Sequence, residues 1–422
     1  MVNKYFHRLG LLFFFFMLVL PTVYQKERGV LLLILVAGCV YKVWVGKWKI
    51  HPTVLCIGIG CVATSLLFML YGIFNDAPGA FSVGTVYVLW PLLFIFFMGV
   101  LNNPSDFEGF TKIIILGVIV SAMMGILLVA EGIGVININI SSFLEFQGAG
   151  LGIFEGTLEY NLYNMTTVIF GFPFLLALIF LPKKLSITNK FWNYLALLAL
   201  ILALITLLIS GRRVFWVISL TSPLILFVIF RISGLANPFK LKPLFFIFVL
   251  ISSVFLIGSV VFKLSFESII YDVLAGFDFA DSSNLSASAR AEQFDALLHG
   301  WIDHPLFGSG HGAAALGSVR SEEQAWAYEL SYLALLFQIG LIGSVIYFSA
   351  LLWTFINSIC VVRTNPESAA MILPLLVGLT CFLIANATNP YLAKFDYLWT
   401  LFLPTGILNA YLLRNSIGHH PR

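Results

Sequence analysis

The chain has 422 residues, of which 60% are hydrophobic and only 10% are charged; its net charge is +3 and its mean hydropathy +0.99. A surface exposed to water needs roughly a quarter of its residues charged, so most of this exterior must face lipid. The composition therefore excludes soluble enzymes, nucleic-acid-binding proteins and secreted disulfide scaffolds. Long uncharged runs predict an all-α polytopic membrane protein, because an outer-membrane barrel shows short alternating segments instead.

Apolar runs of about 17 to 25 residues can cross a bilayer as helices, and they predict about twelve transmembrane helices here. The first run also fits a secretory signal peptide, but Pro21-Thr-Val-Tyr offers a poor cleavage site, so we favour a helix. The expected spans lie near 9–24, 29–46, 53–74, 82–101, 113–131, 162–181, 192–209, 214–231, 243–263, 330–352, 369–388 and 397–413.

The basic residues predict that both termini are cytoplasmic. With that orientation, 15 of the 23 Lys and Arg fall on the cytoplasmic side in short loops, where the positive-inside rule acts. Of the 20 acidic residues, only Asp106, Glu108 and Glu367 fall on that side. The fifteen cytoplasmic basic residues are Lys4, Arg8, Lys42, Lys47, Lys49, Lys112, Lys183, Lys184, Lys190, Arg231, Lys240, Lys242, Arg363, Arg414 and Arg422.

The spans divide the chain into three parts. Residues 1–263 form a bundle of nine helices, residues 264–329 form a large outer, periplasmic loop with the catalytic elements, and residues 330–422 hold helices ten to twelve and a cytoplasmic tail. A second outer segment, 132–161, is Gly-rich and acidic, and we favour a solvated cap over a substrate contact there. None of the 5 cysteines lies in an outer segment, and they predict neither disulfides nor a zinc site.

Arg212 and Arg213 stand in the turn Ser210-Gly-Arg-Arg213, which is all that separates two of the expected spans. So tight a hairpin places two guanidinium groups at the outer bilayer boundary, where the topology rule disfavours positive charge. One interpretation is that both side chains snorkel from helix ends. The other is a clamp for the phosphates of a lipid-linked substrate, because Arg makes bidentate, permanently charged contacts with phosphate.

The long outer loop predicts an amphipathic helix from Ser286 to Trp301, which stops near His304-Pro305. Its apolar face holds Phe294, Leu297, Leu298 and Trp301 at helical spacing. Arg290 then falls in the first turn, where a cation is mildly disfavoured, so an anionic partner explains it better than helix propensity does. An ordinary surface arginine is the alternative. Asp272, Asp278 and Asp281 match no firm metal motif, and we favour a solvated turn.

A glycine-rich turn follows this helix, in Pro305-Leu-Phe-Gly308-Ser-Gly310-His311-Gly312. Its glycines permit close backbone approach and present several free N–H groups, which suit phosphate or sugar oxygens. We expect substrate contacts at Gly308, Gly310 and His311, although many such turns bind nothing. Among the histidines His299, His304 and His311, whose placement is too irregular for a metal site, His311 is the best candidate for a contact.

Glu329 opens the next expected span, near the outer surface. One explanation of this residue is structural, because the helix dipole stabilises a negative charge at the start of a helix. A carboxylate beside an apolar boundary can also act as a general base. Tyr332, three residues further along, is a further candidate for a substrate contact.

The order of these pieces resembles the O-antigen ligase and polymerase superfamily of bacterial membrane glycosyltransferases. The resemblance covers about residues 205–345, and its sharpest parts are Ser210-Gly-Arg-Arg213, His304-Pro-Leu-Phe-Gly-Ser-Gly310, and the helix that ends in Gly340-Leu-Ile-Gly343. It implies a GT-C-like fold. In the ligases the residue eleven before that first glycine is typically His, whereas here it is Glu329. Together with Asn389-Pro-Tyr-Leu392, this departure favours a repeat-unit polymerase over a ligase.

The resemblance implies transfer of a glycan from undecaprenyl pyrophosphate to a sugar hydroxyl, at the outer face of the bacterial inner membrane. The acceptor is another lipid-linked repeat unit for a polymerase and lipid A core for a ligase. Arg212 or Arg213 and Arg290 would balance the charge of the departing pyrophosphate, Glu329 would take the acceptor proton, and neither metal nor cofactor would be needed. A partner protein that regulates chain length also fits this class of enzyme.

The proposed arrangement of the arginines predicts a distance. If one diphosphate is held by all of them, Arg290 should lie within about 15 Å of the 212/213 pair.

The main alternative function is that of a membrane transporter or lipid flippase, but such proteins place ionisable residues near the bilayer midplane. Here the spans carry almost no charge, and Glu131 is the nearest exception. We therefore favour chemistry at the membrane interface.

Overall fold

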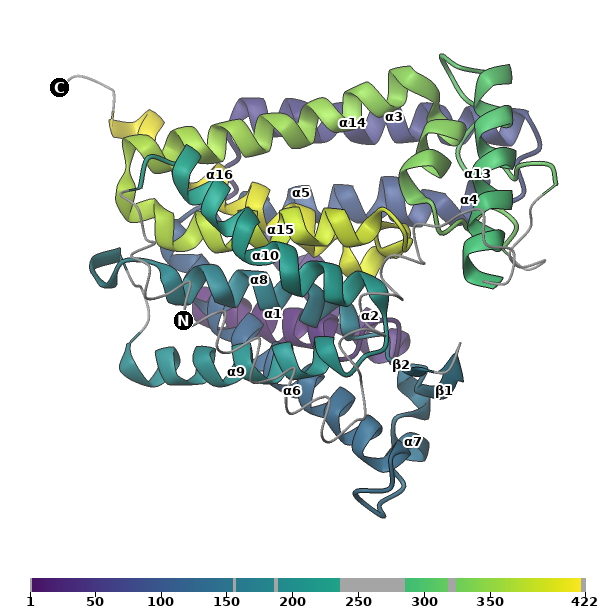
Figure 1. The fold of residues 1–422 in the computed structure, drawn as a ribbon. Coiled ribbons are helices and arrows are strands. Elements are labelled where there is room, and N and C mark those ends of the chain that lie inside the picture. Colours follow the sequence, from purple (N-terminus) through teal and green to yellow (C-terminus); the bar gives the residue numbers. More distant parts are fainter. Residues whose placement is uncertain (1, 155–156, 186–188, 236–284, 318–323, 419–422) are drawn as a thin grey trace. The chain divides into compact units, whose positions relative to one another are not determined.

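The computed structural model describes residues 2–154, 157–185, 189–235, 285–317 and 324–418. Within these ranges the protein is helical apart from one two-stranded hairpin (Figure 1). This confirms the prediction of an all-α multi-pass membrane protein. The described helices that are long and apolar enough to cross a membrane are Pro52–Phe74, Ala80–Val100, Pro104–Gly132, Lys190–Leu208, Arg213–Ile232, Ser331–Thr364 and Pro366–Asn386.

Two shorter apolar helices, Tyr5–Val19 and Met165–Phe180, accompany these 7 candidate spans. The expected span at 243–263 lies outside the described residues, as do Asp272, Asp278 and Asp281. The total of about twelve helices therefore stays a prediction, and so does the division of the chain at 263 and 329.

The chain folds into two compact units, each assembled from separate stretches of sequence. The first unit comprises Met1–Tyr41, Asn103–Leu274 and Ser358–Ala385, and the second comprises Lys42–Asn102, Ala275–Asn357 and Asn386–Arg422. Arg212 and Arg213 belong to the first unit, whereas Arg290 and Glu329 belong to the second. The expected approach of these two sets of residues stays a prediction.

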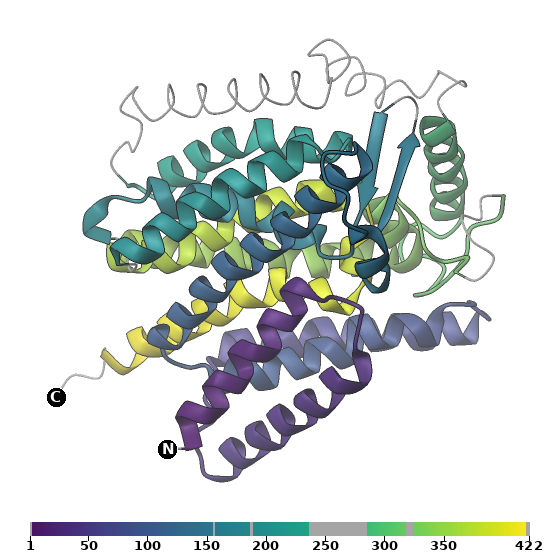
Figure 2. The same cartoon turned by 90° about the horizontal axis from the view of Figure 1, so that it is seen from below.

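The first unit is a helical bundle around α8, which is buried along most of its length. Helices α6, α9 and α10 pack against α8, and α1 packs against α6 (Figure 2). Buried hydroxyls are bonded to neighbouring backbone: Thr167 Oγ1 donates to Leu18 O over 2.7 Å, and Thr206 Oγ1 donates to Leu202 O over 2.8 Å. The main helices drawn from this part of the chain are α1 (Val2–Val19), α2 (Gln25–Trp44), α6 (Glu108–Gly132), α8 (Met165–Phe180), α9 (Lys190–Leu208), α10 (Arg213–Ile232) and α15 (Ala369–Asn386).

The segment 132–161, which the sequence predicts to lie on the outer side, contains the short helix α7 (Ile140–Phe143) and a hairpin of β1 (Gly150–Phe154) and β2 (Thr157–Asn161). The strands pair antiparallel, with Leu151 opposite Tyr160. Tyr160 is buried, and its hydroxyl donates to Thr206 O of α9 over 3.2 Å. This hairpin was not predicted, because the glycines of β1 weaken the strand pattern and the contact that holds it is distant in sequence.

The second unit is built on α3 (Pro52–Phe74), α5 (Trp90–Val100) and α14 (Ser331–Thr364), with α4 (Ala80–Gly84), α13 (Leu285–Asp303) and α16 (Trp399–Gly418). Helix α5 packs against α3 and α16. Two stacked aromatic pairs support the packing around α5. The ring centres of Trp90 and Phe395 are 4.8 Å apart, and those of Phe94 and Phe402 are 4.6 Å apart. The N–H of His51, just before α3, donates to Asn409 Oδ1 of α16 over 2.7 Å.

Candidate functional site

The turn between α9 and α10 is as tight as predicted. Helix α9 ends at Leu208 and α10 begins at Arg213, with Gly211 at a φ of +70° between them. The buried Ser210 hydroxyl donates to Leu207 O over 2.7 Å and accepts from Arg212 N over 3.2 Å. These bonds fix the backbone that carries the two arginines.

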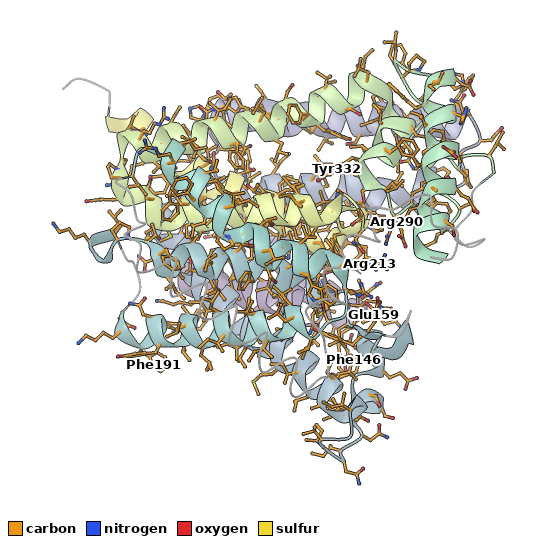
Figure 3. All side chains as sticks on the ribbon, in the orientation of Figure 1. Phe146, Glu159, Phe191, Arg213, Arg290 and Tyr332 are labelled. Atoms are coloured by element: carbon orange, nitrogen blue, oxygen red, sulfur yellow. The ribbon has the colours of Figure 1, made fainter. Side chains whose placement is uncertain are left out.

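Arg212 is partly buried, and its side chain lies close to its own helix α10. Its guanidinium lies 6.0 Å from the centre of the Phe215 ring, and its Nε atom is buried without a hydrogen-bond partner among the described residues. Arg212 also acts electrostatically on Tyr160, whose pKa burial raises well above its ordinary value while the arginine opposes that shift. Figure 3 shows Arg213 at the same end of this unit as Glu159 of the hairpin.

Helix α13 confirms the amphipathic helix predicted for the outer loop, with two corrections. The described helix already runs at Leu285, so Arg290 lies beyond its first turn, and the unfavourable helix dipole does not explain this residue. Leu297 is fully buried, but Phe294 is 46% exposed, and Gln293 takes the buried position instead. The helix face toward the protein is therefore rotated relative to the predicted one.

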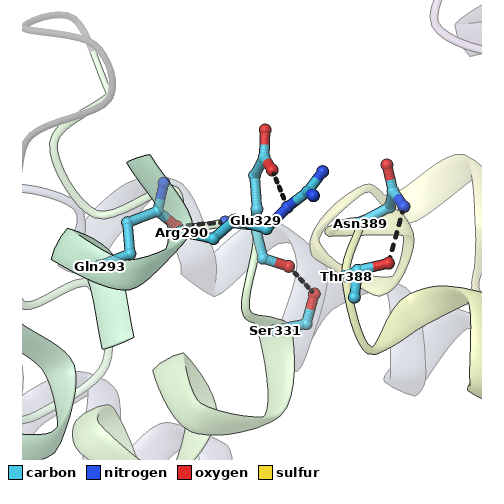
Figure 4. A network of polar contacts seen from close by, with 6 residues as sticks. All are labelled: Arg290, Gln293, Glu329, Ser331, Thr388 and Asn389. Atoms are coloured by element: carbon cyan, nitrogen blue, oxygen red, sulfur yellow. Dashed lines mark hydrogen bonds and ion pairs between the residues drawn. The ribbon is translucent and has the colours of Figure 1, made fainter. Parts of the chain in front are cut away.

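Arg290 and Glu329 are brought together by this helix and by the segment before α14. Arg290 Nε donates to Glu329 Oε2 over 2.9 Å, and the two side chains are 20% and 23% exposed (Figure 4). The backbone N–H of Glu329 donates to the side chain of Gln293 over 2.9 Å. Figure 4 shows the terminal nitrogens of Arg290 directed away from Gln293. The arrangement pairs a carboxylate with a partly exposed guanidinium that has further donors for an anion.

The glycine-rich turn packs its backbone directly against other backbone. Gly308, Gly310 and Gly312 all have positive φ, and a Cβ at each would overlap backbone atoms of the segments packed against them. Gly310 meets Gly72 of α3, and Gly308 meets Gly340 of α14. The close approach predicted for these glycines is thus made to the protein's own main chain.

Helix α14 is broken where the turn meets it. Gly340 has φ 60° and ψ −168°, and the turn takes over the helical hydrogen bonds on both sides of this break. Ser309 N and Gly310 N donate to Phe337 O and Gln338 O over 2.9 and 2.8 Å, while Leu341 N and Ile342 N donate to Pro305 O and Leu306 O over 2.9 and 3.1 Å. The two glycine motifs therefore form one structural joint, in which a broken membrane helix keeps its polar groups satisfied.

The expectation of free N–H groups in this turn is wrong for its central residues. Gly308 N donates to His304 O over 2.8 Å and His311 N donates to Phe68 O over 3.0 Å, in addition to the bonds of Ser309 and Gly310. These donors are already used, so the turn does not form an anion cradle at those positions. A role of Gly308 and Gly310 in contacting substrate stays a prediction.

His311 lies in the interior of the second unit and is fully buried. Its ring stacks on Tyr87 at 4.7 Å, its Nδ1 lies 3.5 Å from Gln338 Oε1, and its Nε2 lies 3.4 Å from the Tyr347 hydroxyl. The Tyr347 hydroxyl in turn bonds Ser65 of α3. Burial lowers the pKa of His311 to about 4, and the hydrogen bond to the amide oxygen of Gln338 acts in the opposite direction. His311 is therefore a neutral, buried side chain that connects the glycine-rich turn to α3 and α14 through its contacts.

We expect the stability of the protein to depend on pH through His311. The unfolded chain binds a proton there below its ordinary pKa of 6.5, whereas the folded protein does so only near 4. The free energy of unfolding should consequently fall by on the order of 3 kcal/mol as the pH drops from 6.5 to 4. Thermal unfolding of the protein in detergent, compared with His311→Gln, measures this. Parallel pH curves for the two proteins would contradict it.

Tyr332 lies in the first turn of α14 and is 45% exposed. Its hydroxyl is hydrogen-bonded to the side chain of Asn386, which is itself buried. Three polar residues that support the site were not predicted: Gln293, Gln338 and Asn386. Gln338 and Asn386 interrupt apolar helical stretches, and that is the signal that marks them, whereas Gln293 stands among the charged residues of α13 and carries no such signal. Among the described residues, no group of three His, Cys, Asp or Glu side chains lies close enough to hold a metal ion.

One family of known proteins is similar to residues 198–348. No curated protein matches the chain. The family model described as O-Antigen ligase matches residues 198–348. This segment contains the Ser210–Arg213 turn, α13, the glycine-rich turn 305–312 and Glu329. Residues 198–348 are therefore similar to the O-antigen ligase family, and this match supports the resemblance of the chain to the O-antigen ligase and polymerase superfamily.

Proposed function

We propose that the protein is a repeat-unit polymerase of an O-antigen type polysaccharide. It would transfer a glycan from undecaprenyl pyrophosphate to a sugar hydroxyl of another lipid-linked repeat unit, on the outer face of the bacterial inner membrane, with both termini in the cytoplasm. The observation that carries the proposal is the contact between Arg290 and Glu329. It places a guanidinium that can bind an anion beside a carboxylate that can act as a base, within the segment that matches the O-antigen ligase family.

The pair can perform the two tasks that this transfer requires. Glu329 takes the proton of the acceptor hydroxyl as its oxygen forms a bond to the anomeric carbon of the donor. The bond from that carbon to the pyrophosphate oxygen breaks, and its electrons leave with undecaprenyl pyrophosphate. The terminal nitrogens of Arg290 stabilise the charge that grows on this leaving group. Since guanidinium groups can supply this positive charge, we propose a metal-independent reaction.

Arg212 is the stronger candidate of the adjacent pair for a phosphate ligand, because its Nε is buried without a partner among the described residues. Arg212→Ala should lower the transfer rate about a hundredfold, as the loss of an electrostatic donor does. Arg213→Ala serves as the matched control and should retain at least about a tenth of the rate. Rates in proteoliposomes measure this, and equal losses in both variants would contradict the assignment.

An O-antigen ligase is the second candidate, since the matching family model carries that description. Glu329, in the position where the ligases typically have His, favours the polymerase. Glycan profiles of cells that lack the chain decide between them. Loss of long chains with a single repeat still on the lipid A core supports the polymerase, and bare core supports the ligase. Unchanged glycans with altered solute uptake would overturn both and point to a transporter. A chain-length regulator as partner stays a prediction.

A further inference from the structure

A group of uncharged polar side chains lies beside the Arg290–Glu329 pair in the second unit. Tyr332 follows Glu329 by three residues, and its hydroxyl bonds Asn386. Asn386 is the last residue of α15, and the turn that follows it carries Thr388 and Asn389. Figure 4 shows Arg290 and Glu329 between Gln293 on one side and Thr388 and Asn389 on the other.

Asn386 holds this turn in place. It is only 2% exposed, and its Oδ1 accepts from Leu392 N over 2.8 Å. Its side chain therefore ties the backbone of the turn to the hydroxyl of Tyr332 at the start of α14. A buried amide that connects two segments in this way fixes the position of the residues between its partners.

Asn389 presents polar groups from the fixed turn. Its Nδ2 donates to Thr388 Oγ1 over 3.2 Å, and its backbone O accepts from Tyr391 N over 2.8 Å. The side chain is partly exposed. No hydrogen bond is described for its Oδ1 within the ranges that the structure covers. An amide has two donors and an acceptor oxygen, so Asn389 retains one donor and one acceptor for a ligand.

The chemistry of these residues differs from that of the arginine beside them. Tyr332, Thr388 and Asn389 carry no charge, so they lack the positive charge that a pyrophosphate favours. Paired donors and acceptors beside a half-exposed aromatic ring match the hydroxyls and the apolar face of a neutral sugar. We propose that Tyr332 and Asn389 form the subsite for the acceptor sugar and that Asn386 positions them. This inference rests on the proposed glycan transfer and adds the residues that orient the attacking hydroxyl toward Glu329.

The experiment uses the full chain in proteoliposomes. The donor is an undecaprenyl pyrophosphate-linked oligosaccharide, and the acceptor is the same oligosaccharide on a shorter prenyl chain. Transfer is measured against acceptor concentration at a fixed, saturating donor concentration. Asn389→Ala should raise the KM for acceptor about five- to tenfold, the effect of one lost hydrogen bond, while kcat stays within about twofold. Tyr332→Phe, which keeps the ring, should raise KM less than Tyr332→Ala.

Asn415→Ala is the matched control, because Asn415 is an exposed asparagine near the end of α16. It should behave as the unaltered protein. A lower kcat at unchanged KM in Asn389→Ala, or no change in either constant, would overturn the acceptor subsite while transfer by the unaltered protein upholds the proposed function. If the unaltered protein transfers no glycan at all, the proposed function itself fails. Thermal unfolding checks that each variant is folded.

Discussion

Replacing Arg290 by alanine should lower the rate of glycan transfer about a hundred- to a thousandfold. The reason is that the departing pyrophosphate gains negative charge in the transition state, and a guanidinium already in position stabilises that charge without reorganisation. Arg290 is bonded to Glu329 through Nε, over 2.9 Å, and Figure 4 shows its terminal nitrogens beyond this contact, so they can bind the substrate without breaking the pair. Transfer from undecaprenyl pyrophosphate-linked oligosaccharide in proteoliposomes measures the effect.

Two variants separate this effect from damage to the fold. The Arg290–Glu329 pair is partly exposed, so its loss should cost at most about 1 kcal/mol of stability. Arg290→Lys keeps the charge but loses the planar fork, and should recover only part of the rate. Arg414→Ala removes an exposed arginine from α16 and should leave the rate unchanged. An Arg290→Ala protein that retains more than about a tenth of the activity would refute its role at the leaving group.

The parts of the fold that follow from local pattern could be predicted from the sequence. Long apolar runs predicted the described membrane helices, and the helical spacing of apolar residues in the outer loop predicted α13. The rotation of α13 could not be predicted, because Gln293 is buried by its bond to Glu329 N, a partner 36 residues away. The hairpin depends in the same way on the contact between Tyr160 and Thr206. Such partners leave no periodic signal in the sequence.

The candidate site shows the same division. The sequence marks Arg290, Glu329 and the glycines as unusual residues, and the structure pairs the first two. The sequence could not reveal that Gly308 packs against Gly340 and Gly310 against Gly72, since close contact between two backbones depends on the tertiary fold. Glycines that serve a broken helix and glycines that serve a phosphate look alike in a sequence. The hydrogen bonds of Ser309 and Gly310 to α14 distinguish the two cases.

Glu329→Gln should lower transfer about a hundred- to ten-thousandfold, because the amide cannot accept the proton of the acceptor hydroxyl. The substitution preserves the shape of the side chain, and its carbonyl oxygen can still accept from Arg290 Nε. The backbone N–H of residue 329 keeps its bond to Gln293 in either protein. The loss therefore measures the base itself rather than the position of α13, and thermal unfolding should show nearly unchanged stability.

Glu329→His gives this prediction its sharper test. A neutral imidazole can also accept a proton, so this variant should recover part of the activity that glutamine loses. Its rate should fall as the pH drops through about 6.5, where an unperturbed imidazole becomes protonated and can no longer act as a base. A purely structural role of Glu329 predicts the opposite order, since glutamine imitates its shape better than histidine does. Full activity in Glu329→Gln would place the base elsewhere and remove the carboxylate from the reaction.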